Sequence, residues 1–148
     1  MNETSLQKYL YAQIPLSRAL GVRVEEVGPE RMRLSAPLQP NLNHRQTAFG
    51  GSVSSLAVLA GWSWLLARLA ERSPVPAVVI QQQTVEYLKP IDDAFEAICT
   101  APSAAAWQRF ERALAARGRA RLELTAEVRC RALCAATFRG LYVALSAR

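Results

Sequence analysis

Apolar and polar residues alternate in two neighbouring runs near the start of the chain. In residues 31–36 every second side chain is apolar, and residues 22–27 form a similar run. Alternation with a period of two is typical of a β-strand with one buried face, and the Gly28-Pro29 pair between the runs favours a turn. The pattern therefore predicts a β-hairpin.

Four further strands are predicted in the second half of the chain, over residues 77–88, 94–100, 119–131 and 133–145. The alternation is clearest in the third of these, where the side chains expected to face inward are Ala120, Leu122, Leu124, Ala126, Val128 and Cys130. A polar block from Gln81 to Thr84 interrupts the first strand. Half of this block faces inward in either register, and a buried amide needs a hydrogen-bond partner. We expect either an interstrand ladder at a subunit interface or part of a site.

Short helices are predicted at three places. Residues 2–12 have weak helical character, and residues 15–20 form a helical turn that Gly21 ends. A third helix begins after Ser103, a good N-cap residue, and ends at Gly118.

Residues 49–72 form the most unusual segment, because its apolar side chains lie all round a helix rather than along one stripe. A membrane span needs about 20 apolar residues, and the uncharged stretch over residues 53–67 is shorter than that. The pattern therefore favours a buried central helix, in which Ala57, Ala60 and Gly61 allow another element to approach closely.

These elements together predict one α+β domain over residues 1–148, in which an antiparallel sheet of about six strands wraps around the long central helix. No charged segment followed by an apolar block opens the chain, so we expect a cytoplasmic protein with no membrane span.

The net charge of +6 raises the question of nucleic-acid binding. However, the arginines alternate with apolar residues, as on the solvent face of a strand, so we expect no nucleic-acid partner. The positive charge of the surface would still attract anionic acyl carriers. The three cysteines lack the partners of a zinc site and are predicted to be buried free thiols; we expect no metal and no cofactor.

The segment from Asn43 to Ser52, N-H-R-Q-T-A-F-G-G-S, leads directly into the long helix. A helix N-terminus presents unpaired N–H groups and partial positive charge, so Gly50 and Gly51 would let a thioester carbonyl approach and would stabilise its oxyanion. Equally, the two glycines could simply permit a tight turn or close packing.

This segment, together with the V-E-Y-L-K-P-I run at Val85 to Ile91, resembles the thioesterase-like domain at the C-terminus of the bacterial YiiD protein. The resemblance spans nearly the whole chain and implies the hot-dog fold. The segment is also similar to the phenylacetyl-CoA thioesterase-like branch of hot-dog enzymes, in which an Asn lies seven residues before the first glycine of H-G-G. Asn43 and Gly50 keep this spacing. The resemblance implies that Asn43 positions the thioester or its attacking water, and that the Gly51 N–H contributes to the oxyanion site.

The sequence departs from that branch at two positions. Phe49 replaces the histidine, and the helix position expected to carry an acid falls near Val58, with no acid before Glu71. Hydrolysis needs a base or an oriented water. Candidates to orient water are Ser52 and Ser55; His44, the only histidine, and Glu86 are weaker candidates for the missing base or acid. The predicted catalytic residues are Asn43, Gly51, Ser55 and Gln83, and the predicted substrate-binding residues are His44, Thr47, Phe49, Gly50, Ser52 and Thr84.

Three functions are compatible with these residues. The favoured one is hydrolysis of acyl-CoA or acyl-carrier-protein thioesters, with the acyl chain along the apolar helix. A non-catalytic acyl-binding or regulatory module would keep the pocket without the base, and a hot-dog dehydratase would need a histidine with an acid. Trp62, Trp64 and Trp107 could border an acyl tunnel or simply fill the core. The resemblance implies a homodimer, or a dimer of dimers, in which Gln83 or Thr84 meets the neighbouring subunit's Asn43 loop.

Overall fold

The computed structural model describes residues 1–147. Its helices are α1 (Glu3–Gln13), α2 (Pro15–Leu20), α3 (Gly50–Leu69) and α4 (Ala104–Arg117), and η1 (Gln39–Asn41) is a single 3-10 turn. Its strands are β1 (Arg23–Val27), β2 (Arg31–Ala36), β3 (Ala77–Tyr87), β4 (Phe95–Thr100), β5 (Arg119–Cys130) and β6 (Leu133–Leu145). The predicted types and order of these elements are confirmed, and only the ends differ, by a few residues.

Local side-chain chemistry accounts for the ends of the helices. Asn2 caps α1 in a reciprocal pair of hydrogen bonds with Ser5, and the Ser103 hydroxyl accepts from the Ala106 N–H at the start of α4. Helices α2 and α4 end at Gly21 and Gly118, whose φ angles of 73° and 67° favour glycine.

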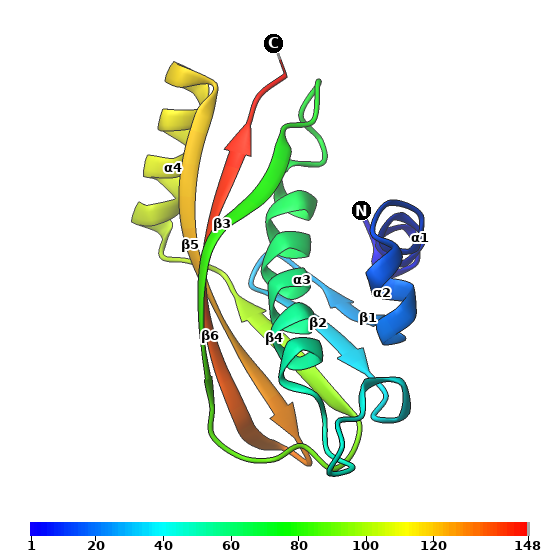
Figure 1. Cartoon of the computed structure of the whole chain (residues 1–148). Helices are drawn as coiled ribbons and strands as arrows, with labels where there is room; N and C mark the ends of the chain where they lie inside the picture. Colours follow the sequence, from blue (N-terminus) through cyan, green and yellow to red (C-terminus); the bar gives the residue numbers. More distant parts are fainter. Residues whose placement is uncertain (148) are drawn as a thin grey trace.

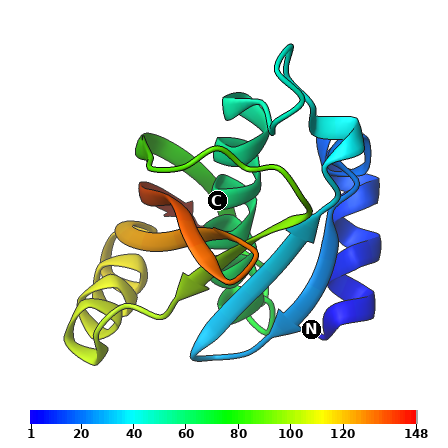
Figure 2. The ribbon, with the colours of Figure 1, turned by 90° about the horizontal axis from the view of Figure 1, so that it is seen from below.

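The six strands form one antiparallel sheet with the order β1-β2-β4-β5-β6-β3. The sheet curls around α3, as Figure 1 shows from the side and Figure 2 from below. Helices α1 and α2 lie beside α3, and α4 lies along β5. This is the predicted hot-dog arrangement, with β1 and β3 as the two edge strands.

Helix α3 and the inward side chains of the sheet form the core. All six residues predicted to face inward from β5 are buried. Gly61 lets the Tyr142 side chain of β6 approach α3 closely, because a Cβ at this position would overlap the ring of Tyr142. The Tyr142 hydroxyl donates to the Val58 carbonyl at 2.7 Å, so it fixes the helix to the sheet.

Helix α3 is long and apolar enough to cross a membrane by length and composition alone. In this fold, however, 61% of its most apolar window is buried against the sheet and the other helices. No membrane span is indicated for this helix, which agrees with the prediction of a buried central helix.

The alternation of β3 is broken by a bulge between Ile80 and Gln82. Beyond the bulge Gln83 pairs with Gly140 and Val85 pairs with the buried Phe138, so Gln83 and Val85 point to the side of the sheet that holds α3. Thr84 pairs with Arg139 and points to the opposite side. The residues of the polar block are largely exposed because β3 has a neighbouring strand on one side only.

The cysteines are all free thiols. Cys99 and Cys130 are buried as predicted, whereas Cys134, near the turn between β5 and β6, is only partly buried. Burial raises the pKa of the Cys99 thiol to about 12, so this thiol stays protonated at neutral pH.

Candidate active site

Asn43 organises the loop that precedes α3. Its side-chain oxygen accepts from the N–H groups of Arg45 and Thr47 at 2.8 and 3.1 Å. Its side-chain nitrogen donates to the Thr47 hydroxyl at 2.9 Å and to the Ala48 carbonyl at 3.5 Å. Asn43 and Thr47 therefore support each other within the loop, and Asn43 has a structural role there whether or not it also contacts substrate.

A second asparagine anchors the same loop and was not singled out from the sequence. Asn41 is 2% exposed, and its amide nitrogen donates to the carbonyls of Leu20 and Pro37 at 2.9 and 2.8 Å. Its backbone carbonyl accepts from the Phe49 N–H at 2.7 Å. Asn41 thus fixes the start of α3 to the end of α2, while His44 lies exposed at the tip of the loop.

The N-terminus of α3 retains free donors. The Phe49 carbonyl accepts the N–H groups of Ser52 and Val53, and within residues 1–147 no backbone carbonyl accepts the N–H of Gly50 or Gly51. These two groups carry the partial positive charge of the helix terminus. They meet the electrostatic requirement of an oxyanion site, the role predicted for Gly51.

Packing alone does not require a glycine at either position. A Cβ at Gly50 would lie at an ordinary van der Waals distance, 3.4 Å, from the ring of Tyr87, and a Cβ at Gly51 would overlap only the exposed ring of Phe49. The Tyr87 hydroxyl donates to the Gly50 carbonyl at 2.9 Å, which ties the end of β3 to the start of α3. Sequence reasoning missed Tyr87 because the contact joins residues far apart in the chain.

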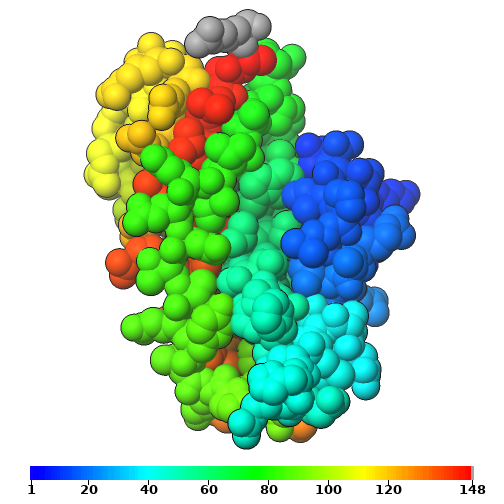
Figure 3. Space-filling view, in the orientation of Figure 1, coloured from blue at the N-terminus to red at the C-terminus, as the bar shows by residue number. Residues whose placement is uncertain are grey.

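An apolar groove runs along the side of α3 that the sheet leaves uncovered. Its volume is about 230 Å³, and we call it the α3 groove. It is lined by Ile14, Leu16, Ser54, Ser55, Val58, Leu59, Trp62 and Gln83. In Figure 3 the surface of α3 is visible as a band between α1 and α2 (blue) and β3 (green).

The α3 groove brings together two of the predicted catalytic residues, Ser55 and Gln83. Ser54 also lines it, although its hydroxyl donates to the Gly51 carbonyl at 3.1 Å. Ser55 lies about 6 Å along the helix axis from Gly51, at a rise of 1.5 Å per residue. Ser52 is partly buried in the first turn of α3 and does not line the groove.

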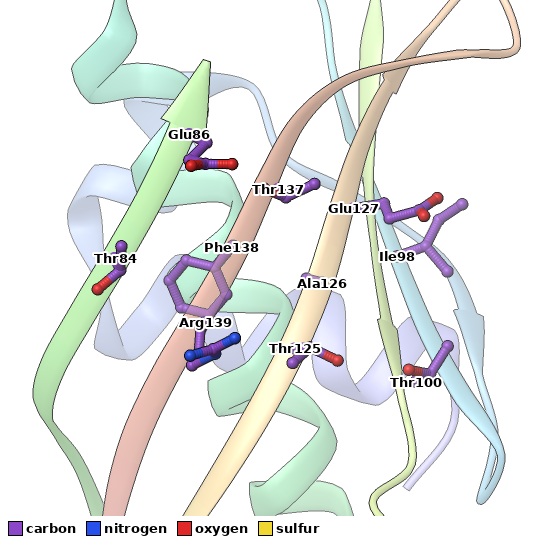
Figure 4. A pocket seen from close by; sticks show the side chains of 10 residues that line it. All are labelled: Thr84, Glu86, Ile98, Thr100, Thr125, Ala126, Glu127, Thr137, Phe138 and Arg139. Atoms are coloured by element: carbon purple, nitrogen blue, oxygen red, sulfur yellow. The ribbon is translucent and has the colours of Figure 1, made fainter. Parts of the chain in front are cut away.

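Thr84 and Glu86 lie on the other face of the sheet. They line a separate hollow of about 530 Å³ between β3, β6, β5 and β4, and Figure 4 shows their side chains there with Thr137 and Arg139. The bulge in β3 accounts for this placement. Thr84 and Glu86 therefore do not share the α3 groove with Gln83, and Glu86 is not positioned to supply an acid to it within this subunit.

A family model described as "Putative thioesterase (yiiD_Cterm)" matches residues 3–146. The chain belongs to this family. The predicted resemblance to the YiiD C-terminal domain is thereby confirmed, and the family assignment supports a thioester hydrolase function.

Solved structures of similar proteins have the same fold. A protein of unknown function from Chlorobaculum tepidum is 28% identical, with a TM-score of 0.92 over 98% of this chain and 94% of that chain. A Shewanella oneidensis protein described as a "putative thioesterase" is 27% identical, with a TM-score of 0.82 over 97% of this chain and 96% of that chain. A Pseudomonas aeruginosa protein described as a probable thioesterase is 23% identical, with a TM-score of 0.82 over 97% and 96%.

In this member of the YiiD-type thioesterase family the groove offers hydroxyl, amide and apolar groups but no titratable side chain among its lining residues. Hydroxyl and amide groups orient water, and helix N–H groups stabilise an oxyanion, but none of these accepts a proton at neutral pH. The chemistry that this subunit can supply is thus positioning and electrostatic stabilisation.

Proposed function

We propose that this protein hydrolyses acyl thioesters of coenzyme A or of an acyl carrier protein. The observation that carries the proposal is the apolar α3 groove with Ser55 and Gln83 at its border, one to two helical turns from the free N–H groups of Gly50 and Gly51. An acyl chain fits the apolar lining, and a thioester carbonyl fits the helix terminus. The net charge of +6 attracts both anionic carriers. These substrates imply a cytoplasmic location.

In the proposed reaction a water molecule attacks the thioester carbonyl carbon. The new C–O bond forms as the carbonyl electrons move to oxygen, where the Gly51 N–H stabilises the negative charge. Collapse of this intermediate breaks the C–S bond, and the proton from water passes to the departing sulfur, so that the products are a carboxylic acid and a thiol. A thiol has a pKa of about 8.5, so its thiolate leaves without strong acid assistance.

The proposed working unit is a homodimer that pairs its β3 strands, and dimers of this kind could associate further. Strand β3 is a long edge strand, and an unpaired edge is a template for a second chain. The Trp62 indole already donates to the Val78 carbonyl at 2.8 Å, so pairing would use the strand beyond Val78. Such pairing would bring Gln83 towards the partner subunit's Asn43 loop and helix terminus, and would join the two halves of the site.

Subunit mixing tests the shared site. Gly51→Val blocks the approach of the carbonyl to the helix terminus of its own subunit, and Gln83→Ala removes the amide that the pairing presents to the partner subunit's helix terminus; each variant alone should release little thiol from acyl-CoA. A mixed dimer of the two variants contains one intact site, so statistical exchange should restore about a quarter of wild-type activity. Activity equal to the sum of the two separate variants would contradict a shared site, and a monomeric sedimentation mass would contradict the dimer.

A second function, non-catalytic acyl binding, is favoured by one specific observation. The groove lining contains no titratable side chain, and His44 is exposed at the loop tip rather than in the groove. Binding of both acyl-CoA and acyl carrier protein thioesters without release of free thiol would establish the binding module and overturn hydrolysis.

A further inference from the structure

Trp62 lies at one end of the α3 groove. The residues that α3 contributes to the groove run from Ser54 at the end near Gly51 to Trp62 at the far end. Two contacts hold the indole ring in place. Its N–H donates to the Val78 carbonyl at 2.8 Å, and Tyr9 of α1 stacks on it with ring centroids 6.1 Å apart.

These contacts make Trp62 a fixed wall rather than a mobile cover. The Val78 carbonyl belongs to β3, and Tyr9 belongs to α1, so the ring is held between these two elements. Trp62 is only partly buried, although it lies on the core helix. Trp62 also lines the groove, which makes its side chain accessible to a ligand there.

The dimensions of the groove define what fits against this wall. A carbonyl at the Gly51 N–H and the ring of Trp62 are eleven residues apart on α3, which is about 16 Å at 1.5 Å per residue. An extended chain spans about 1.2 Å per bond, because a residue of three backbone bonds spans about 3.6 Å, so about fourteen carbons fit this length. The volume of about 230 Å³ exceeds the cavity of ~150 Å³ that accepts benzene.

We infer that the α3 groove holds an unbranched acyl chain whose carbonyl lies at the Gly51 N–H, and that Trp62, at the far end of the groove, sets the upper limit at about fourteen carbons. Val58 and Leu59 line the middle of the α3 groove and supply apolar contacts along the acyl chain. This inference rests on the proposed function for the identity of the thioester, while the size of the groove is independent of catalysis.

The test compares acyl-CoA substrates of four to twenty carbons with the wild-type protein and two groove variants. The wild type should prefer chains of about fourteen carbons, with kcat/KM lower by about tenfold at eighteen carbons. Trp62→Ala should open the end of the groove and shift the preference towards eighteen carbons. Val58→Phe should fill the middle of the groove and shift it towards eight.

Two further variants separate the size of the groove from the general effect of replacing a tryptophan. Trp62→Phe keeps an aromatic wall but loses the hydrogen bond to Val78, so it should shift the preference less than Trp62→Ala. Trp64→Phe is the matched control, because Trp64 is a buried tryptophan of the same helix that contacts Trp107 instead of the groove. It should leave the chain-length preference unchanged.

The same proteins are titrated with free n-alkanoic acids by calorimetry, so that catalysis and binding are judged separately. Turnover with an unchanged chain-length preference in both Trp62→Ala and Val58→Phe overturns the inference and leaves hydrolysis standing. Binding of alkanoic acids that shifts with these variants, without turnover of any thioester, supports the groove and overturns hydrolysis. Neither turnover nor alkanoic-acid binding in a folded wild-type protein overturns both.

Discussion

Strands β5 and β3 are both long and both pair with β6, but their side chains are distributed in opposite ways. Strand β5 lies between two strands, and buried residues alternate with exposed ones along it without interruption for most of its length. Strand β3 has one neighbour, a bulge after Ile80 and a polar block that is largely exposed. The comparison indicates that β5 is constrained by the core, whereas β3 is free to border a groove and to pair with another subunit.

The largest expected difference concerns stability. Leu124→Ala removes a fully buried side chain of β5 and should lower the free energy of unfolding by about 2–5 kcal/mol, because it loses apolar burial and leaves a cavity. Thr125→Ala, at the next position on the exposed face, should change it by less than about 0.5 kcal/mol. Urea denaturation monitored by circular dichroism measures both, and equal effects would contradict the assignment of faces.

The regularity of β5 is also why it could be predicted from the sequence. Its inward residues must fit the pleated sheet, so the period of two fixes which side chains are buried. Helix α3 was equally predictable, because side chains that are apolar all round require cover on most sides. The caps at Ser103, Gly21 and Gly118 followed from local chemistry within a few residues of chain.

The candidate site was predicted less completely, because its geometry depends on contacts between distant residues. The bulge in β3 sends Gln83 rather than Thr84 towards α3, and nothing in the run of glutamines identifies the extra residue. Tyr87 reaches Gly50 only after the sheet has formed, and Asn41 is buried by the end of α2. The glycines were predicted as an oxyanion site or as packing residues. Among residues 1–147 their N–H groups have no backbone acceptor, and the atoms nearest to a Cβ at either position belong to an aromatic ring.

Substitutions in β3 are expected to change activity rather than stability. Gln83→Ala should lower kcat/KM for acyl-CoA hydrolysis by about ten- to a hundredfold, or about 1.4–2.7 kcal/mol of transition-state stabilisation, if its amide orients the attacking water. The melting temperature should hardly change, because the side chain is exposed. Gln82→Ala is the matched control on the opposite face and should keep wild-type activity. Loss of activity in both variants would indicate a general disturbance of the edge strand.

The last expected effect appears only at alkaline pH, and it distinguishes the interior beside β5 from the exposed edge. Cys99 pairs with Ala126 of β5, and burial raises the pKa of its thiol from 9.0 to about 12. Burial, together with the charge of a Cys99 thiolate, also raises the pKa of Tyr142, which pairs with Leu122. Above pH 9 the unfolded chain therefore loses protons that the folded chain retains.

The unfolded state then binds fewer protons, so the free energy of unfolding falls as pH rises, by up to about 1.4 kcal/mol per pH unit for each group. We expect this decline between about pH 9 and pH 12 in urea denaturation series, with the Cys99 contribution ending near its folded pKa. Cys99→Ala should lower the free energy of unfolding at neutral pH because it leaves a cavity. It should also make the decline of this free energy at alkaline pH less steep, because one titrating group has been removed. An unchanged slope would mean that the Cys99 thiol ionises as readily in the folded protein as in the unfolded chain, contrary to its burial beside β5.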